Sequence, residues 1–211
     1  MKKLGLGVLA SGRGTNLQAI IDACAEARIP AVVRVVVSDV EDAFALERGR
    51  RAGIPAVHID PGKFKTKLEP DRELEYARCL KEHGTDLVLL AGFMRVLHSD
   101  FLSVFAGRIM NIHPALLPSF PGLHAQKQAL DRGVRFAGCT VHFVDDSVDG
   151  GPIILQAVVP VEQDDTEETL SARILKEEHR IYCEAVALFS EGRLLIRGRR
   201  VQILPRPLGE C

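Results

Sequence analysis

Residues 4–21 read LGLGVLASGRGTNLQAII, and this stretch decides the fold. Its opening LGLGVLA is apolar and interrupted only by glycine, which is typical of a buried strand. From Thr15 onward, apolar residues recur along one face of a helix. The glycine-rich segment 11–14 therefore joins a strand directly to a helix. Free backbone N–H groups at a helix start attract anions, so we predict either a phosphate site at Gly14, Thr15 and Asn16 or an ordinary tight turn capped by Thr15.

The same alternation of strand and helix runs along the rest of the chain. Strands are predicted at 4–10, 31–38, 55–59, 86–91, 108–113, 138–144 and 152–159, and helices at 15–27, 43–52, 71–82 and 166–190. This order indicates an α/β fold, with a Rossmann-like, mostly parallel twisted sheet and helices on both faces. The last segment predicts a C-terminal hairpin, 193–197 with 200–204. No linker or repeat divides the chain, so we expect a single domain over 1–211.

Ligands of such sheets bind beyond the carboxyl ends of the strands. We therefore expect the chemistry to lie in the loops that follow Ala10, Ala91, His113 and Val144.

Asn111 and His113 stand two residues apart at the end of a predicted strand. Residues i and i+2 of a strand face the same side, so the amide and the imidazole point into one cleft. Pro114 holds His113 extended. Asn supplies a neutral donor for a developing oxyanion, and His exchanges a proton near neutral pH. The alternative is that His113 is a structural histidine at a strand end, with its hydrogen bonds met within the protein.

Asp149 is followed by Gly150 and Gly151 on a predicted loop. This pattern suits a carboxylate aimed into a cleft, where it would favour the imidazolium form of His113. The alternative is a turn aspartate before the strand that starts at Pro152. No pair of histidines has metal-ligand spacing with a carboxylate, so no metal is predicted.

The composition narrows the class of partner. Hydrophobic residues make up 46% and charged residues 26%, which fits a soluble globular protein. The net charge is −1 and no basic run is interleaved with aromatics, so neither nucleic acid nor a membrane is an expected partner. The five cysteines are widely spaced and lack a Cys-x-x-Cys pair, which indicates reduced cytoplasmic thiols. The N-terminus has no secretory signal pattern.

Four motifs in order carry a resemblance. They are SGRGTNLQAII (11–21), LAGFMRVL (90–97), NIHPALLPSFPGLH (111–124) and DGGPIILQ (149–156). Together they closely resemble the glycinamide ribonucleotide formyltransferases of purine biosynthesis, and the match runs from about Leu4 to Leu195. The segment after Gly198 carries none of the resemblance.

The resemblance implies a role for each matching residue. It implies catalytic roles for Asn111, His113 and Asp149; phosphate and ribose binding by Gly14, Thr15, Asn16 and Glu178; and folate binding by Lys67, Met94, Arg95, Val96, Leu97, Asn111, His142 and Asp145. Lys67 stands where many relatives carry an arginine. A lysine keeps the positive charge but cannot donate the two parallel hydrogen bonds of a guanidinium.

The implied reaction is direct attack of the glycinamide amine on the formyl carbon of the co-substrate 10-formyltetrahydrofolate. Asn111 and protonated His113 would stabilise the tetrahedral oxyanion, and Asp149 would keep His113 charged. Both substrates would be small molecules, bound by a monomer or a homodimer. The alternatives are another folate-dependent formyltransferase, a formyltetrahydrofolate hydrolase, or a non-catalytic nucleotide-binding module. We expect a methionyl-tRNA formyltransferase to carry a further C-terminal domain and the hydrolase to carry a regulatory domain before its first strand.

Overall fold

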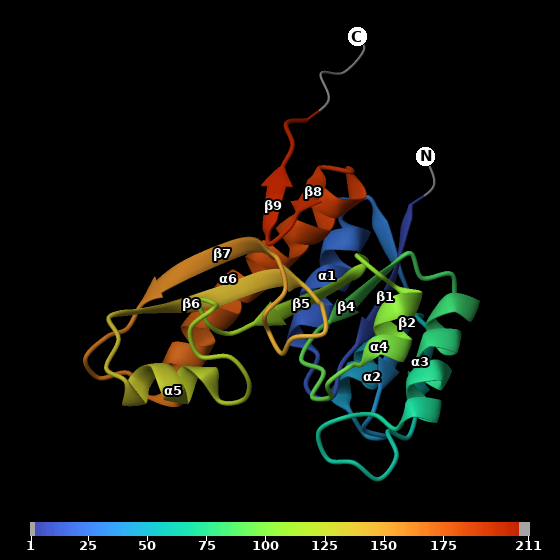
Figure 1. Ribbon diagram of the computed structural model, residues 1–211, viewed down its shortest axis with the longest axis horizontal. Helices are drawn as coiled ribbons and strands as arrows, with labels where there is room; N and C mark the ends of the chain where they lie inside the picture. The colour runs from blue at the N-terminus through green and yellow to red at the C-terminus, as the bar shows by residue number, and fades with distance from the viewer. Residues whose placement is uncertain (1–2, 207–211) are drawn as a thin grey trace.

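The computed structural model describes residues 3–206, and the strands within them form one nine-stranded sheet in the order β3-β2-β1-β4-β5-β6-β7-β9-β8 (Figure 1). The strands are β1 (Leu4–Leu9), β2 (Ala31–Ser38), β3 (Ala56–His58), β4 (Leu87–Leu90), β5 (Ile109–His113), β6 (Phe136–Phe143), β7 (Ile153–Pro160), β8 (Leu194–Arg197) and β9 (Arg200–Ile203). The helices are α1 (Thr15–Ala25), α2 (Phe44–Arg51), α3 (Pro70–Glu82), α4 (Ser99–Val104), α5 (Ala125–Asp131) and α6 (Glu167–Ser190).

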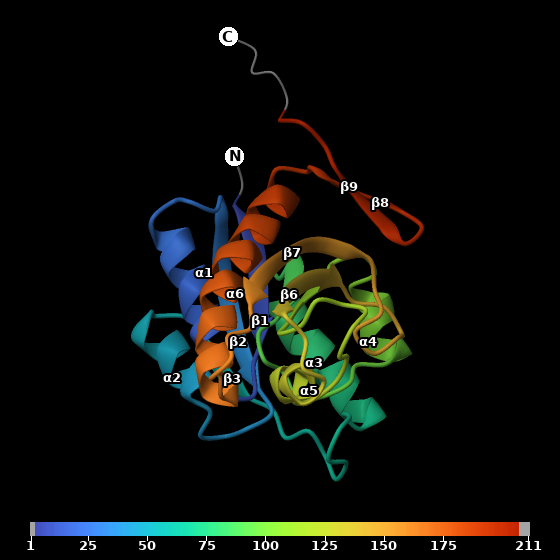
Figure 2. The same ribbon diagram turned by 90° about the vertical axis from the view of Figure 1, so that its left-hand side faces the viewer.

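Strands β1 to β5 pair in parallel, and helices cover both of their faces. Figure 2 shows α1, α2 and α6 on one side of the strands and α3 and α4 on the other. The alternation of side chains along each strand produces the two layers of core. In β2, for example, Val36 packs toward α1 and α2, whereas Val35 and Val37 pack toward α3 and α4. The predicted fold class is confirmed.

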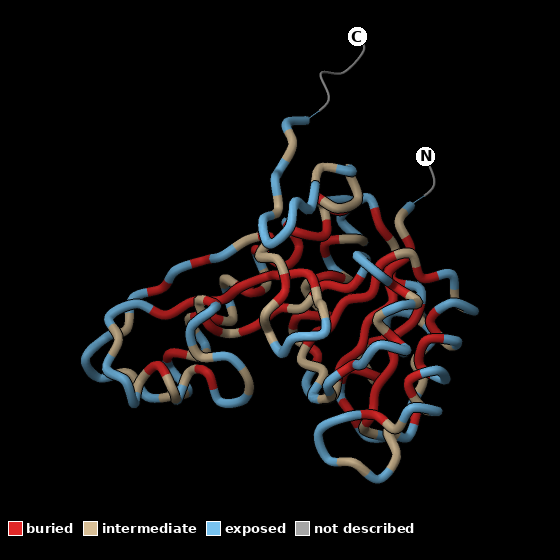
Figure 3. The backbone as a smooth tube through the Cα atoms, in the orientation of Figure 1, coloured by how far each residue is buried: buried red, intermediate tan, exposed pale blue. Residues whose placement is uncertain are grey.

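Burial follows this arrangement closely. The central strands are buried along their length, whereas the loop between β3 and α3 is exposed or half-buried except at Ile59 and Leu68 (Figure 3). The Tyr182 side chain of α6 packs against the sheet, and its hydroxyl is 3.0 Å from the carbonyl oxygens of both Leu90 and Met110. This buried contact ties α6 to the two strands whose ends carry the candidate site.

Element boundaries differ from the predicted ones by one or two residues. Helix α1 ends at Ala25 because the chain turns into the left-handed region at Ala27, where φ is 57°. Strand β6 starts at Phe136, two residues before its predicted start. The C-terminal hairpin is confirmed, and it joins the sheet through the pair Ile153 and Arg200.

The direction of β6 corrects one prediction. We predicted that the loop after Val144 lies at the carboxyl ends of parallel strands, but β6 runs antiparallel to β5. Its end therefore lies beside the start of β5, where the Val144 N–H donates to the Ile109 carbonyl oxygen. The loop that follows must fold back over the face of β5 and β6 before β7 begins.

No helix within residues 3–206 is both long enough and apolar enough to cross a membrane. The four cysteines in this part of the chain carry free thiols, and Cys211 lies outside it.

Candidate active site

Strands β5 and β6 present a row of polar side chains on one face. Asn111 lies opposite His142 and His113 lies opposite Thr140 in the antiparallel register. Directly opposed residues project to the same side, so all four side chains face away from α6. His113, Thr140 and His142 are buried, and Asn111 is partly exposed. Asn111 and His113 therefore share one face of the sheet, as their two-residue spacing predicted.

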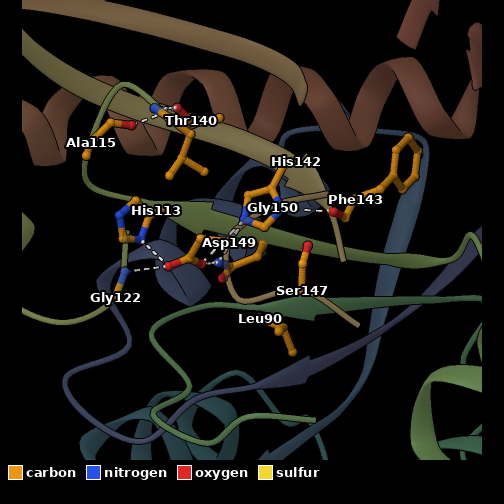
Figure 4. Close-up of polar contacts among 12 residues, drawn as sticks. Leu90, His113, Ala115, Gly122, Thr140, His142, Phe143, Ser147, Asp149 and Gly150 are labelled. Atoms are coloured by element: carbon orange, nitrogen blue, oxygen red, sulfur yellow. Dashed lines mark hydrogen bonds and ion pairs between the residues drawn. The ribbon is translucent and has the colours of Figure 1, made fainter. Parts of the chain in front are cut away.

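Asp149, in the loop between β6 and β7, adds its carboxylate to this group. Figure 4 shows its carboxylate between His113 and the backbone of Gly122. Its Oδ2 atom lies 3.3 Å from His113 Nδ1 and accepts a hydrogen bond of 2.8 Å from the Gly122 N–H. Its Oδ1 atom accepts from Asn111 Nδ2 at 3.3 Å. One carboxylate thus contacts both predicted catalytic side chains.

The backbone at Asp149 is unusual for a side-chain-bearing residue, with φ of 52°. Aspartate tolerates this left-handed conformation better than most residues. The next two residues leave no room for side chains. A Cβ at Gly151 would lie 1.8 Å from the Phe143 carbonyl oxygen, and one at Gly150 would lie 2.2 Å from Ser147 Oγ. The Asp-Gly-Gly pattern is therefore what lets the loop fold back tightly over β6.

The surroundings keep the Asp149 carboxyl ionised. Burial alone would raise its pKa. The contacts from His142 and the Gly122 N–H, together with the charge of a protonated His113, outweigh burial and hold the pKa below its usual value. Asp149 is therefore an acceptor throughout the neutral range.

An ionised Asp149 also orients the Asn111 amide. Because a carboxylate can only accept, the NH₂ group of Asn111, and not its carbonyl, must face Asp149. The same nitrogen lies 3.1 Å from His142 Nε2. His142 Nδ1 lies 2.8 Å from the Phe143 carbonyl oxygen, so Nδ1 carries a proton, and His142 Nε2 faces both the Asn111 amide and, at 3.7 Å, Asp149 Oδ1.

The His113 ring lies between two acceptors. Its Nδ1 faces Asp149 and its Nε2 lies 2.8 Å from the carbonyl oxygen of Phe120. A neutral ring can donate to only one of them, whereas the doubly protonated ring donates to both. Each ring nitrogen of His113 thus faces one acceptor, which orients the ring between Asp149 and Phe120.

The glycine-rich loop follows β1 and starts α1. Gly14 has φ of 66°, and no side chain caps the helix. A Cβ at Gly14 would lie 2.8 Å from the Cα of Ala45, so the glycine is required for packing against α2 as well as for its φ. Arg48 of α2 donates from Nε to the Arg13 carbonyl oxygen at 2.8 Å. This loop is thus rigidly held, with an uncapped helix start and a guanidinium beside it.

Asn16 and Glu178 meet although they are far apart in sequence. Asn16 Nδ2 donates to Glu178 Oε2 at 2.8 Å, and both residues are buried. Burial raises the pKa of Glu178, and the hydrogen bond from Asn16 offsets part of this. One of the two hydrogens of the Asn16 amide is therefore engaged by Glu178. The Asn16 backbone N–H at the helix start remains suited to binding a phosphate.

Four of the predicted folate residues, Met94 to Leu97, follow β4, and Lys67 lies beside them. Met94 and Val96 are exposed, with 55% and 38% of their surface accessible. Lys67 is exposed and pairs through its backbone with Val96. Leu97, by contrast, packs in the core toward α3 and α4. Only the backbone of Leu97 is available to a ligand.

The Arg95 side chain makes its hydrogen bonds within the protein. Its Nε donates to Asp39 Oδ2 at 2.6 Å, and its Nη1 donates to the carbonyl oxygens of Phe64 and Lys65. The Asp39 carboxylate is 1% exposed. The Arg95 side chain therefore ties the loop between β3 and α3 to Asp39 and is engaged within the protein.

The Asp145 side chain also makes its hydrogen bonds within its own loop. Its Oδ1 accepts hydrogen bonds from the backbone N–H of Ser147, at 2.9 Å, and from the Ser147 hydroxyl. Neither contact reaches the row on β5 and β6. The backbone groups of Phe120 and Gly122, in contrast, contact the candidate catalytic residues His113 and Asp149 directly, and the sequence predicted neither contact.

A model of the family described as formyl transferase matches residues 6–186. The chain belongs to the formyl transferase family. Over 191 residues this formyl transferase is 48% identical to the phosphoribosylglycinamide formyltransferase of Escherichia coli K12, a match that covers 90% of this chain and 89% of that protein. The glycinamide ribonucleotide transformylase 1 structure from Symbiobacterium toebii superposes with a TM-score of 0.93 at 58% identity, covering 96% and 95% of the two chains.

A third relative bears on the alternatives. A formyltetrahydrofolate deformylase from Pseudomonas syringae superposes with a TM-score of 0.88, but at 26% identity and over 67% of its own chain. The resemblance to the glycinamide ribonucleotide formyltransferases is confirmed, and the alternatives are less well supported.

Proposed function

We propose that this formyl transferase moves the formyl group of 10-formyltetrahydrofolate to the amine of phosphoribosylglycinamide in purine biosynthesis. The observation that carries the proposal is the Asp149 carboxylate, which contacts His113 and Asn111 at once. In this arrangement the protonated His113 imidazole supplies a charged donor and the Asn111 amide supplies a neutral donor for one oxyanion.

The reaction requires little from the protein beyond placement and charge. The amine nitrogen attacks the formyl carbon, and the carbonyl oxygen becomes an oxyanion that accepts hydrogen bonds from Asn111 and protonated His113. The amine then loses a proton, the bond from carbon to the folate nitrogen breaks, and that nitrogen takes up a proton. Binding both substrates in one cleft supplies the orientation.

The geometry indicates how Asn111 reaches the formyl oxygen. Both hydrogens of its amide nitrogen are engaged, by His142 at 3.1 Å and by Asp149 at 3.3 Å. In the proposed reaction the formyl oxygen takes the place of the longer contact, the one to Asp149. His142 then keeps the amide in place while Asp149 turns fully toward His113.

The two substrates occupy neighbouring loops in this proposal. The phosphate binds the backbone N–H groups at Gly14, Thr15 and Asn16, and Glu178 accepts from the ribose. The folate lies against Met94 and Val96, with His142 at the inner end and Lys67 offering charge at the outer end. Ser11 supports this arrangement, because its hydroxyl accepts from the Met94 N–H at 2.8 Å and joins the two loops.

The free thiols of the described cysteines fit a reducing compartment, and we infer that the enzyme works in the cytoplasm.

The test distinguishes transfer from hydrolysis. The protein is mixed with 10-formyltetrahydrofolate, with and without phosphoribosylglycinamide, and tetrahydrofolate and formylated product are measured. We expect both products only when the ribonucleotide is present, and neither from His113→Ala. Release of formate without the ribonucleotide would instead establish a hydrolase.

A further inference from the structure

A row of three side chains crosses strands β5, β6 and β7 beside the catalytic group. His113 lies opposite Thr140, and Thr140 lies opposite Gln156. Opposed residues share a face of the sheet, so the Thr140 hydroxyl lies on the same face as the His113 ring. Thr140 is fully buried and Gln156 is exposed.

The Thr140 hydroxyl uses all of its hydrogen-bonding capacity on this row and the loop after β5. It donates to the Ala115 carbonyl oxygen at 2.7 Å, a contact drawn in Figure 4. It accepts from the Leu117 N–H at 3.1 Å and from Gln156 Nε2 at 2.9 Å. Gln156 Nε2 also donates to the Leu117 carbonyl oxygen at 2.9 Å. One hydroxyl and one amide thus fix the start of the loop.

The same loop supplies both backbone contacts to the catalytic pair. Five residues after Ala115, the Phe120 carbonyl oxygen meets His113 Nε2, and the Gly122 N–H then meets Asp149 Oδ2. Phe120 has φ of 56°, an unfavourable conformation that only surrounding contacts can maintain. The position of the loop therefore decides whether His113 stays between its two acceptors.

We propose that Thr140, supported by Gln156, is a positioning residue for the transfer reaction. Its hydroxyl holds segment 115–117 so that the Phe120 carbonyl oxygen and the Gly122 N–H reach His113 and Asp149. Thr140 touches neither substrate in this proposal. The inference rests on the proposed function, because it assigns a role through His113.

The hydroxyl, and not the shape of the side chain, carries this role. Valine has nearly the same shape as threonine and makes no hydrogen bond. In Thr140→Val the Leu117 N–H and the Ala115 carbonyl oxygen lose a buried partner, which is a costly state that the loop relieves by moving. Serine retains the oxygen, so Thr140→Ser keeps all three contacts available.

The experiment compares Thr140→Val, Thr140→Ser and Gln156→Ala with wild type. Thr85→Val is the matched control, since Thr85 is buried and its hydroxyl has no hydrogen-bond partner within the described part of the chain. Steady-state assays give kcat and both KM values, and ¹⁵N NMR of histidine-labelled protein reports on the His113 ring. Gln156 is exposed, so Gln156→Ala tests the same network should Thr140→Val fail to fold.

We expect Thr140→Val to lower kcat about tenfold to a hundredfold, as small misplacements of catalytic groups do. The KM for the ribonucleotide should change little, and the His113 Nε2 signal should shift. Thr140→Ser and Thr85→Val should resemble wild type, and Gln156→Ala should lie between. Equal losses in Thr140→Val and Thr140→Ser, or an unchanged kcat and His113 signal in Thr140→Val and Gln156→Ala, would overturn the inference. Full activity of His113→Ala would instead overturn the proposed function.

Discussion

The Asp149 carboxylate lies 3.3 Å from Nδ1 of His113 and, through its other oxygen, 3.3 Å from the amide nitrogen of Asn111. Both of its oxygens therefore face donors, and the Gly122 N–H adds a third. This leaves no orientation in which a donor at position 149 is tolerated.

Asp149→Asn should therefore lower kcat about a hundredfold or more, the range in which general acid–base groups contribute. Whichever way the new amide turns, its NH₂ group meets Asn111 on one side or Gly122 and His113 on the other. The fold should survive, because asparagine tolerates φ of 52° as well as aspartate does. Steady-state kinetics and a circular dichroism spectrum check both expectations.

The matched control is Asp146→Asn, which changes an exposed residue of the same loop. It should leave kcat near the wild-type value. A double variant, Asp149→Asn with His113→Ala, should be little worse than the less active single variant if the two residues act as a unit. Additive losses would show that Asp149 acts independently of His113.

The sequence predicted the elements and the shared face of Asn111 and His113, because both depend on local patterns. Hydrophobic periodicity placed β1 to β5 and their helices, and the two-residue spacing of Asn111 and His113 placed their side chains on one face. The direction of β6 could not be predicted this way, because alternation along a strand does not depend on which neighbour it pairs with.

Two further kinds of contact could not be predicted from the sequence: contacts made by backbone groups, and contacts between residues far apart along the chain. The Phe120 carbonyl oxygen and the Gly122 N–H are groups that every such residue carries, so no residue type marks them. Arg95 and Asp39 are separated by 56 residues, and neither motif alone indicates that they pair. Arg95 was predicted only as a folate-binding residue, and its side-chain contacts with Asp39, Phe64 and Lys65 were not predicted.

Substitution of Gly14 should cost more than the loss of the proposed phosphate contact alone. Gly14→Ala forces a Cβ to within 2.8 Å of the Ala45 Cα and places alanine in the left-handed region, which by itself costs about 1–2 kcal/mol. The free energy of unfolding, measured by urea denaturation, should fall by at least that amount. Gly12→Ala is the control, since a Cβ there meets nothing within 4 Å.

The stability of Gly14→Ala decides how variants of this loop are interpreted. A KM increase for the ribonucleotide in Gly14→Ala or Gly14→Val reports misfolding as much as lost phosphate contacts. A Gly14→Ala protein as stable as Gly12→Ala would contradict the packing argument.

Arg95→Met should destabilise the protein and loosen the loop between β3 and α3. Removing one partner of a buried ion pair leaves the Asp39 carboxylate uncompensated, a loss of about 3 kcal/mol or more. The carbonyl oxygens of Phe64 and Lys65 lose their donor at the same time. Urea denaturation measures the first effect. Limited trypsin digestion measures the second, because the loop carries Lys63, Lys65 and Lys67.

Arg72→Met is the control for this variant, since Arg72 forms an exposed ion pair with Glu75. Exposed pairs contribute little, so stability and cleavage should stay near wild type. Unchanged trypsin cleavage in Arg95→Met would show that other contacts hold the loop.

Glu178→Gln should separate substrate binding from stability. Burial raises the pKa of Glu178 above its unfolded value of 4.5, so the folded state binds this proton more tightly than the unfolded state does. The stability contribution of Glu178 is therefore greatest below pH 4.5 and declines as the pH rises toward and through the folded pKa. A rise of one pH unit between the unfolded and the folded pKa removes about 1.4 kcal/mol. A neutral glutamine shows no such decline.

The variant should therefore gain stability relative to wild type between pH 4 and pH 7.5, as followed by urea denaturation, while its KM for phosphoribosylglycinamide rises about tenfold because a charged acceptor is lost. Glu177→Gln, one residue earlier on α6 and partly exposed, is the matched control. A stability difference between Glu178→Gln and wild type that stays constant with pH would mean that the buried carboxyl is not perturbed. An unchanged KM would remove Glu178 from the ribose site and leave its contact with Asn16 as a purely structural link between α1 and α6.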